Sequence, residues 1–275
     1  MILAVQSIKI KPYADSILGF ENTCNFPIKK LFISGLTDLE IERKIHKINP
    51  DLILAIGRDA LIKVKNIKSK PIVYIMVLNP QSILSTNKNI TGISMNITYE
   101  KQLVEFADSL PNIKRIGLLF DPERTNFPIK KVQSTAKKLG LELIIKEVNK
   151  LAEVPSLIKS VGQKIDAFWM LPDKTVISAQ SIEFMLLFSL ENNIPLLSFS
   201  AKYVEMGALL SLDIVPFDIG KQAGETAKKI LSGYDIKDIP KMEPREIVLT
   251  INLKIAKKLG INFSDKIIKK AKIIP

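Results

Sequence analysis

The sequence predicts an α/β protein built from two similar lobes, each a doubly wound parallel sheet. Strand-sized apolar runs alternate with helical segments along the chain, and runs such as 51–56 and 166–171 are apolar after their first residue. Continuous apolar strands are typical of parallel sheets that helices cover on both faces. The series of elements restarts near residue 98, which indicates that one structural unit is repeated.

The first half of the chain contains the elements of one lobe. Helical periodicity covers residues 13–22, and Thr37 with Glu40 forms a capping box that opens a helix ending near residue 48. A short helix is expected at 59–64. The expected strands are the apolar runs at residues 2–5, 30–33, 51–56, 71–78 and 89–94.

The second half repeats this series. Residues 50–56 can be overlaid on 165–171, and residues 70–75 on 194–199. The expected helices are at 99–110, 127–139, 154–161 and 181–192, and the expected strands at 115–120, 141–147, 166–171 and 195–199.

The last part of the chain is expected to complete both lobes. It offers helices at 201–207, 217–232 and 253–259 and strands at 208–213 and 246–251. We therefore expect residues 1–95 with 201–245 to form the N-terminal lobe and residues 96–200 with 246–275 to form the C-terminal lobe. With this division the chain passes from one lobe to the other three times, and each passage is called a crossing below. Three crossings between two lobes with open sheets predict a hinge and a cleft.

Composition argues against several classes of protein. No apolar run approaches the ~20 residues that span a bilayer. The formal charge is +12, but the lysines are spread along the chain, so a lysine-rich surface is expected rather than a nucleic-acid partner. Cys24 and His46 are the only cysteine and histidine, which leaves no intrachain disulfide and makes a zinc site or other cofactor unexpected.

Candidate ligand-binding residues follow the strands, because open parallel sheets bind ligands beyond the carboxyl ends of their strands. Arg58 and Arg124 are suited to clamp a carboxylate, and Ser7 and Asn79 are neutral donors. Asp173 is suited either to accept an ammonium group or to cap the following helix. The full candidate set is Ser7, Gly57, Arg58, Asn79, Arg124, Thr125, Asp173, Ser200 and Asp213.

Many of these residue types are also ordinary turn formers and helix caps. The chain has no nucleophile elbow, no phosphate-binding glycine loop and no dinucleotide fingerprint. A binding protein is therefore expected rather than an enzyme, with a cytoplasmic α/β enzyme as the less favoured alternative.

Several segments resemble one protein family in the same order along the chain. They are residues 89–94, 114–123, 166–173, 207–210, 219–224 and 252–260. They resemble the solute-binding components of a bacterial ABC transporter family, some of whose members bind tryptophan or other aromatic amino acids. The resemblance implies the type I periplasmic-binding-protein fold, with ligand contacts at Ser7, Asn79, Arg124, Thr125, Asp173 and Ser200.

The resemblance also implies a function and a location. We expect a monomeric extracytoplasmic receptor, periplasmic or membrane-anchored, whose precursor carries a signal sequence before Met1. It would close on a small solute and dock on an ABC permease. A sensor of the same fold that feeds a signalling partner is the alternative.

The sequence leaves the identity of the solute open. Relatives often carry a small Gly/Thr-rich turn in place of residues 57–59, and Asp-Pro in place of Asn79-Pro80. An amino acid or related metabolite is expected, and an acidic or otherwise different ligand is the alternative.

Overall fold

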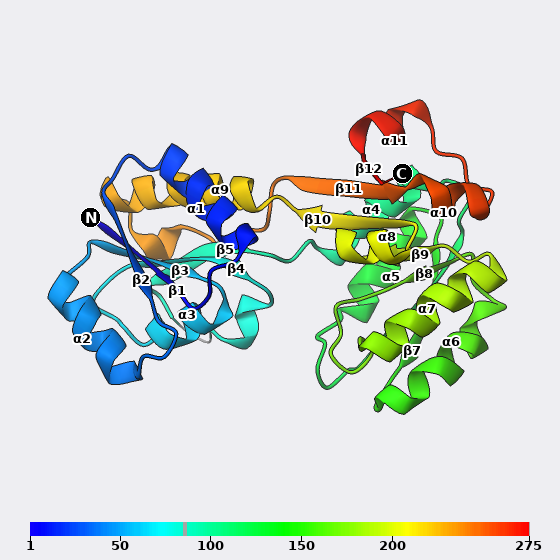
Figure 1. The fold of residues 1–275 in the computed structure, drawn as a ribbon, viewed down its shortest axis with the longest axis horizontal. Coiled ribbons are helices and arrows are strands. Elements are labelled where there is room, and N and C mark those ends of the chain that lie inside the picture. Colours follow the sequence, from blue (N-terminus) through cyan, green and yellow to red (C-terminus); the bar gives the residue numbers. More distant parts are fainter. Residues whose placement is uncertain (85–86, 275) are drawn as a thin grey trace. The chain divides into compact units, whose positions relative to one another are not determined.

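A computed structural model describes residues 1–84 and 87–274, which form two compact units (Figure 1). Unit 1 comprises Met1–Ile97 and Ile214–Ile247, and unit 2 comprises Thr98–Asp213 and Val248–Pro275. The chain therefore crosses between the units three times.

Unit 1 is built on a five-stranded sheet of order β2-β1-β3-β4-β5 in which neighbouring strands are parallel. All strands but β2 are completely buried, as continuous apolar runs require. Edge strand β2 instead exposes its two lysines. The strands are β1 (Ile2–Gln6), β2 (Ile28–Phe32), β3 (Leu52–Ile56), β4 (Ile72–Val77) and β5 (Ile90–Ser94).

Helices cover both faces of this sheet and give unit 1 two cores. On one face lie α1 (Lys11–Thr23) and α9 (Pro216–Leu231), which run side by side in Figure 1. On the other lie α2 (Asp38–Ile48) and α3 (Arg58–Val64). The short helices η1 (Pro80–Ser82) and η3 (Ile236–Asp238) complete the unit.

The predicted capping box at the start of α2 is confirmed. The Glu40 backbone N–H donates to Thr37 Oγ1 at 3.3 Å, and the Thr37 N–H donates to Glu40 Oε2 at 2.8 Å. The backbone hydrogen bond to Thr37 is the largest cause that lowers the pKa of the Glu40 carboxyl.

Glycines allow α1 and α9 to approach at backbone distance. A Cβ atom added at Gly220 would lie 1.9 Å from the carbonyl oxygen of Ser16, and one at Gly19 would lie 1.9 Å from that of Phe217. Only a missing side chain permits this contact, so the pairing of α1 with α9 depends on these glycines.

Unit 2 is built on a seven-stranded sheet of order β12-β11-β10-β9-β8-β6-β7. The pairs β6–β7, β6–β8, β8–β9, β9–β10 and β11–β12 are parallel. The strands are β6 (Arg115–Phe120), β7 (Glu142–Glu147), β8 (Ala167–Trp169), β9 (Leu196–Ser198), β10 (Leu210–Ile214), β11 (Ile247–Asn252) and β12 (Lys272–Ile274).

One core of unit 2 lies between this sheet and the helices α6, α7 and α8, and it includes Phe168 and Met170. The helices of unit 2 are α4 (Tyr99–Ser109), α5 (Ile129–Lys138), α6 (Val154–Gly162), α7 (Ala179–Asn192), α8 (Ala201–Met206), α10 (Leu253–Lys258) and α11 (Asp265–Lys270), with η2 (Leu151–Glu153) before α6.

The predicted repeat is visible in the sheet orders. The order β2-β1-β3-β4-β5 in unit 1 corresponds strand for strand to β7-β6-β8-β9-β10 in unit 2. Segments 50–56 and 165–171, which overlay in sequence, contain the equivalent strands β3 and β8. The fold is therefore two α/β lobes with parallel-sheet cores, as predicted.

One predicted lobe boundary is wrong. We expected residues 201–245 to return to the N-terminal lobe, but β10 pairs with β9, so that Leu210 lies opposite Leu197 and Ser211 opposite Ser198. Residues up to Asp213 therefore belong to unit 2, and the second crossing lies at 213/214 instead of near 200. The first and third crossings, at 97/98 and 247/248, lie two residues from the expected positions.

Candidate functional site

Four of the nine predicted ligand-binding residues lie in unit 1. Ser7 follows β1, Gly57 and Arg58 follow β3, and Asn79 follows β4. Since these three strands are adjacent and parallel, the four residues lie at the same, carboxyl edge of the sheet.

Gly57 has a conformation and a location that favour glycine. Its φ angle is +88°, and it caps the N-terminus of α3. An added Cβ atom would lie 2.1 Å from the hydroxyl oxygen of Tyr13 on α1. The glycine therefore allows the tyrosine ring to pack against the turn after β3.

Arg58 and Asn79 are connected through Ser82. Arg58 Nη1 donates to Ser82 Oγ at 3.3 Å, and Ser82 Oγ donates to the Asn79 carbonyl at 2.8 Å. Asn79 adopts the left-handed conformation with φ +49° and is bonded twice to Asn96, whose Oδ1 accepts from its backbone N–H. Arg58 and Asn79 are both exposed, so their polar groups remain accessible.

The end of β4 beside this set is irregular. Met76 is a non-glycine residue with φ +56°, and the register between β4 and β5 shifts between Tyr74 and Val77. Bulges and residues with positive φ are enriched at binding sites, where they redirect the residues that follow. The irregularity therefore turns the chain directly before Asn79.

The other five predicted residues lie in unit 2, again at the carboxyl edge of adjacent strands. Arg124 and Thr125 follow β6, Asp173 follows β8, Ser200 follows β9, and Asp213 lies in β10. The structure therefore groups the nine predicted residues into two sets, one in each unit.

Two carboxylates, Asp121 and Asp173, join the ends of β6 and β8. Asp173 is 1% exposed, and its carboxylate accepts from the backbone N–H of Asp121 at 2.8 Å, Thr175 at 2.8 Å and Val176 at 3.1 Å. The helix that follows, α7, is capped by Ser178 and not by Asp173, so the predicted capping role is wrong: Asp173 instead holds the turn after β8 to the end of β6. Acceptance of an ammonium group by Asp173 stays a prediction.

Asp121 is the second member of this pair. Its Oδ2 accepts from Thr175 Oγ1 at 2.5 Å and lies 3.5 Å from Arg124 Nε, and its Oδ1 accepts from the backbone N–H of Glu123 at 2.9 Å. The hydrogen bond from Thr175, above all, lowers the pKa of the Asp121 carboxyl. Asp121 is therefore ionised at neutral pH.

Ser200 and Asp213 are also brought together. The Asp213 carboxylate accepts from the backbone N–H of Ala201, directly after Ser200, at 3.1 Å and from Ser211 Oγ at 2.6 Å. Burial raises the pKa of the Asp213 carboxyl, and the Ser211 bond opposes this shift. Asp213 thus holds the turn between β9 and α8.

An aromatic cluster borders the carboxylate pair. The rings of Tyr99 and Phe127 are 4.7 Å apart at 64°, and the ring of Trp169 lies 5.8 Å from Tyr99 and 6.1 Å from Phe127. Burial, assisted by the charge of Asp173, raises the pKa of Tyr99 to about 12. Tyr99 therefore stays a neutral phenol beside the carboxylates.

Sequence reasoning missed three of these residues as candidates: Asp121, Thr175 and Tyr99. A usable signal was present for the first, because an Asp follows a buried apolar run in both loops, at 121 and 173. Tyr99 gives no such signal, since only the packing of α4 brings it to Phe127 and Trp169.

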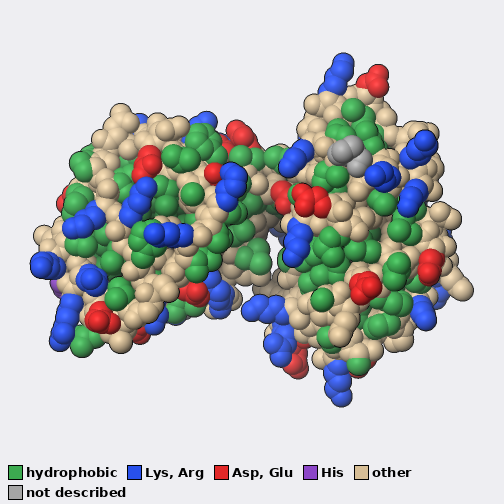
Figure 2. Space-filling model, viewed as in Figure 1, with side chains coloured by type: hydrophobic (Ala, Val, Ile, Leu, Met, Phe, Trp, Pro, Cys, Tyr) green, Lys and Arg blue, Asp and Glu red, His purple; other side chains and the backbone are tan. Residues whose placement is uncertain are grey.

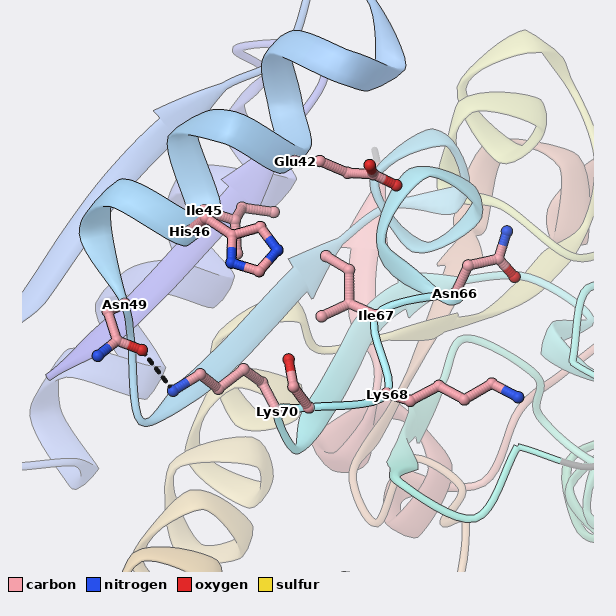
Figure 3. Close-up of a pocket in the computed structure, with 9 residues that line it drawn as sticks. Glu42, Ile45, His46, Asn49, Asn66, Ile67, Lys68 and Lys70 are labelled. Carbon is pink, nitrogen blue, oxygen red and sulfur yellow. Dashed lines mark hydrogen bonds between the residues drawn. The ribbon is translucent and has the colours of Figure 1, made fainter.

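A separate hollow of about 300 Å³ lies at the opposite edge of the sheet in unit 1 (Figure 3). His46 and Asn49 at the end of α2 face the loop before β4, where Lys70 Nζ donates to Asn49 Oδ1 at 2.7 Å. Lys68 points away from it. None of the predicted residues lines this hollow, so it is not the candidate site.

Three further observations concern surface charge, metal ligands and membrane spans. Lys and Arg side chains are scattered over the face of each unit in Figure 2 rather than gathered in one patch. Within residues 1–84 and 87–274, no group of three or more His, Cys, Asp or Glu side chains is arranged to hold a metal ion. In the same residues, no helix has the length and apolarity needed to cross a membrane.

The chain is similar to proteins of known structure along its whole length. A ligand-free, open substrate-binding protein with adhesive properties from Clostridium difficile matches with a TM-score of 0.79 and 25% identity, covering 99% of this chain and 98% of that chain. A Streptococcus pneumonia ABC domain in complex with L-Trp matches with a TM-score of 0.63 and 22% identity over the full length of both chains.

Sequence comparison gives two curated relatives. A tyrosine-binding protein of Clostridioides difficile is 28% identical over 225 residues, which are 78% of this chain and 65% of that protein. An uncharacterised Rickettsia prowazekii protein is 26% identical over 78% of this chain and 69% of its own length. The match thus spans slightly less than two thirds of the first relative.

The family model described as ABC transporter substrate binding protein matches residues 34–274, which include every predicted site residue except Ser7. This range contains most of both units and all three crossings between them. The chain therefore belongs to the ABC transporter substrate-binding protein family.

Proposed function

We propose that the protein is the extracytoplasmic receptor of an ABC importer, which binds a small solute and presents it to a membrane permease. The observation that carries this proposal is the family match over residues 34–274. The similarity in fold to substrate-binding proteins over 99% of the chain supports it.

We propose an amino acid as the solute, on the basis of the groups at the edge of unit 2. A zwitterion needs an acceptor for its ammonium group and a cation or N–H donors for its carboxylate. The ionised Asp121 provides the acceptor, and the guanidinium of Arg124, whose side chain is 66% exposed, provides the cation.

The aromatic cluster supports an aromatic amino acid in particular. The half-buried ring of Tyr99, which packs against the buried Phe127, offers an aromatic surface, and aromatic pairs gain energy beyond simple burial. The tyrosine-binding relative and the L-Trp complex of the streptococcal protein also support an aromatic amino acid as the solute. That the nine predicted residues contact the solute stays a prediction.

A thermal-shift and calorimetry panel tests the proposal. The full chain is titrated with L-tyrosine, L-tryptophan, L-phenylalanine, the acidic amino acids and a set of small metabolites. A true solute at 100 times its Kd stabilises the protein by about 2.7 kcal/mol and raises Tm accordingly. A panel in which no compound raises Tm in a saturable manner would contradict the proposed function.

Arg124→Met tests the ligand assignment, with Lys130→Met as the matched control. Both variants remove one exposed cation, but only Arg124 lies beside Asp121. We expect Arg124→Met to raise the Kd of the solute by about tenfold to a hundredfold, because a hydrogen bond to a charged group is lost. Equal Kd values for the two variants would show that Arg124 does not hold the solute.

A further inference from the structure

The unit-1 side of the crossings contains a charged cluster that the proposed binding site does not use. Arg245 lies two residues before the third crossing, and Asp218 lies four residues after the second. Arg245 Nε and Nη2 donate to Asp218 Oδ1 at 3.0 and 2.8 Å, and Nη1 donates to Glu225 Oε1 at 3.1 Å.

Only the Asp218 end of this ion pair is buried, since the side chains of Arg245 and Glu225 are 41% and 47% exposed. The side chain of Asp218 is only 3% exposed, and it sits in the first turn of α9, where the helix dipole favours a negative charge. The contact with Asp218 is the main cause that raises the pKa of the Arg245 guanidinium. Loss of the arginine would leave a buried carboxylate uncompensated, which is costly.

Hydrogen bonds to backbone groups also hold the segment before the third crossing to α9 and to β5. Gln222 of α9 accepts from the Arg245 N–H at 3.2 Å and donates to the Glu243 carbonyl at 3.3 Å. Met242 pairs with β5, since it donates to the Gly92 carbonyl and accepts from the Ser94 N–H, both at 2.9 Å. The segment before the third crossing is thus held to β5 and to α9.

Very little chain remains between these anchors and the strands of unit 2. Only Val215 separates the end of β10 from the start of α9, and only Glu246 separates Arg245 from the start of β11. Val215 precedes Pro216 and has extended angles, φ −101° and ψ 99°, to which a residue before proline is restricted.

We propose that Arg245 is a positioning residue that ties the second and third crossings to unit 1 as one rigid bracket, so that their bending is confined to Val215 and Glu246. The bracket consists of Asp218, Gln222, Glu225 and Arg245. The idea rests on the proposed function in one respect: the two units are taken to change their relative orientation when solute binds. Without the guanidinium, residues 243–245 would keep their contacts with Gln222 but lose the tie to Asp218 and Glu225, so that the third joint would loosen.

Hydrogen exchange followed by mass spectrometry tests the bracket without any ligand. We expect Arg245→Met to speed the exchange of amides in residues 243–247 about tenfold, because the side-chain part of their anchor to α9 is lost and only the Gln222 contacts remain. Arg245→Lys, which keeps the charge but not the two-pronged contact, should give a smaller increase and guards against a misfolded variant.

Arg115→Met is the matched control. Arg115 makes a comparable ion pair with Asp166, at 2.7 Å, but at the amino end of β6 and away from the crossings. It should leave exchange in 243–247 unchanged. Exchange that rises equally throughout unit 1 in Arg245→Met, or does not rise in 243–247, would overturn the proposal.

A distance measurement adds a readout that a merely structural role would not change. Spin labels are attached at Lys44→Cys on α2 and Lys138→Cys on α5, both exposed, in a Cys24→Ala background. We expect the distribution of label distances to broaden in Arg245→Met and to keep its wild-type width in Arg115→Met. An unchanged width in Arg245→Met would refute the bracket.

The two proposals fail in different ways. Failure of the amino-acid panel would reject the proposed solute while leaving the exchange and distance results interpretable. If L-tyrosine raises Tm but Arg245→Met alters neither exchange nor label distances, the receptor proposal stands and the bracket does not.

Discussion

Asp173 illustrates how a buried carboxylate is tolerated in the core of unit 2. Its oxygens accept three backbone hydrogen bonds from the ends of β6 and from the turn after β8. A buried charge without such partners would be strongly unfavourable. The residue therefore fixes the relative position of two strand ends on which the candidate site is built.

Asp173→Ala should destabilise the protein strongly. It leaves two buried N–H groups and one half-buried N–H group without an acceptor, and we expect a loss of about 3 kcal/mol or more in the free energy of unfolding, measured by urea denaturation. Asp173→Asn, which keeps one acceptor oxygen, should cost less, and the exposed Asp108→Ala should cost almost nothing. A small effect of Asp173→Ala would mean that the N–H groups find other acceptors.

The pH dependence of stability should show the lowered pKa of Asp121. Because its folded-state pKa lies below the unfolded value of about 3.9, its contribution is present above that value and is lost as pH falls through the folded pKa. Asp121→Asn should therefore flatten the fall of the urea midpoint between about pH 5 and pH 2.

Asp213 should behave in the opposite sense and serves as the comparison. Burial raises its pKa, so the stability associated with its neutral form is present below the unfolded pKa and is lost as pH rises through the folded pKa. Asp213→Asn should therefore flatten the fall of the urea midpoint as pH rises above the unfolded pKa of this carboxyl. If both variants change the profile in the same pH range, the assignment of the two shifts is wrong.

Gly57 and Gly35 allow backbone strain to be separated from steric overlap. Both have positive φ, but an added Cβ would meet Tyr13 at Gly57 and nothing within 4 Å at Gly35. Gly35→Ala should cost about 1–2 kcal/mol, and Gly57→Ala about 3 kcal/mol or more, in urea denaturation. Similar costs would indicate that the Tyr13 ring moves aside freely.

At the level of residues, the sequence located the strand ends but not their partners. Arg124 and Asp173 were predicted because each follows an apolar run. The contact of Asp121 with Thr175 depends on the register of β6 and β8, which pair across about 50 residues of chain. Because β6 and β8 are buried on both faces, their apolar runs lack the alternation of apolar and polar residues that would fix this register.

At the level of elements, the contact between α1 and α9 leaves no room for side chains at two positions. Gly19 and Gly220 each approach a backbone carbonyl of the other helix. An alanine in a free helix is more favourable than a glycine by about 1 kcal/mol. This contact should reverse that preference.

Gly220→Ala is therefore expected to destabilise unit 1 by about 3 kcal/mol or more, because the Cβ would overlap the Ser16 carbonyl and force the helices apart. Urea denaturation measures the change. Lys228→Ala, on the exposed face of the same helix, should alter stability by less than about 0.5 kcal/mol. A stabilising Gly220→Ala would show that the helices can separate at no cost.

Most helices and strands were predictable because each carries its own periodicity or cap. The destination of the strand at 208–213 was not, since an apolar run does not specify which strand it will pair with. The short helix α11 and the short strand β12 were not predicted either. A helix of about six residues, such as α11, does not form from local propensity alone.

At the level of the whole molecule, each unit has its own core but a discontinuous chain. In unit 1, α9 covers the sheet face that also holds Ile17 and Phe20 of α1. We expect residues 1–97 alone to remain unfolded or aggregated, since that face would be exposed.

Residues 1–97 joined to 214–247 by a flexible linker of about eight residues should fold as an independent unit. Circular dichroism and a single cooperative urea transition would identify it, with the 1–97 fragment as control. A cooperative transition for 1–97 alone would show that α9 is dispensable.

The return of α9 to unit 1 also sets the order in which the protein can mature during synthesis. The ribosome must make all of Thr98–Asp213 before the helix that closes the first core emerges. At roughly 5–20 residues per second this takes on the order of ten seconds. Throughout that interval the N-terminal segment lacks α9 and is accessible to chaperones, a state that would suit the export that the proposed receptor function requires.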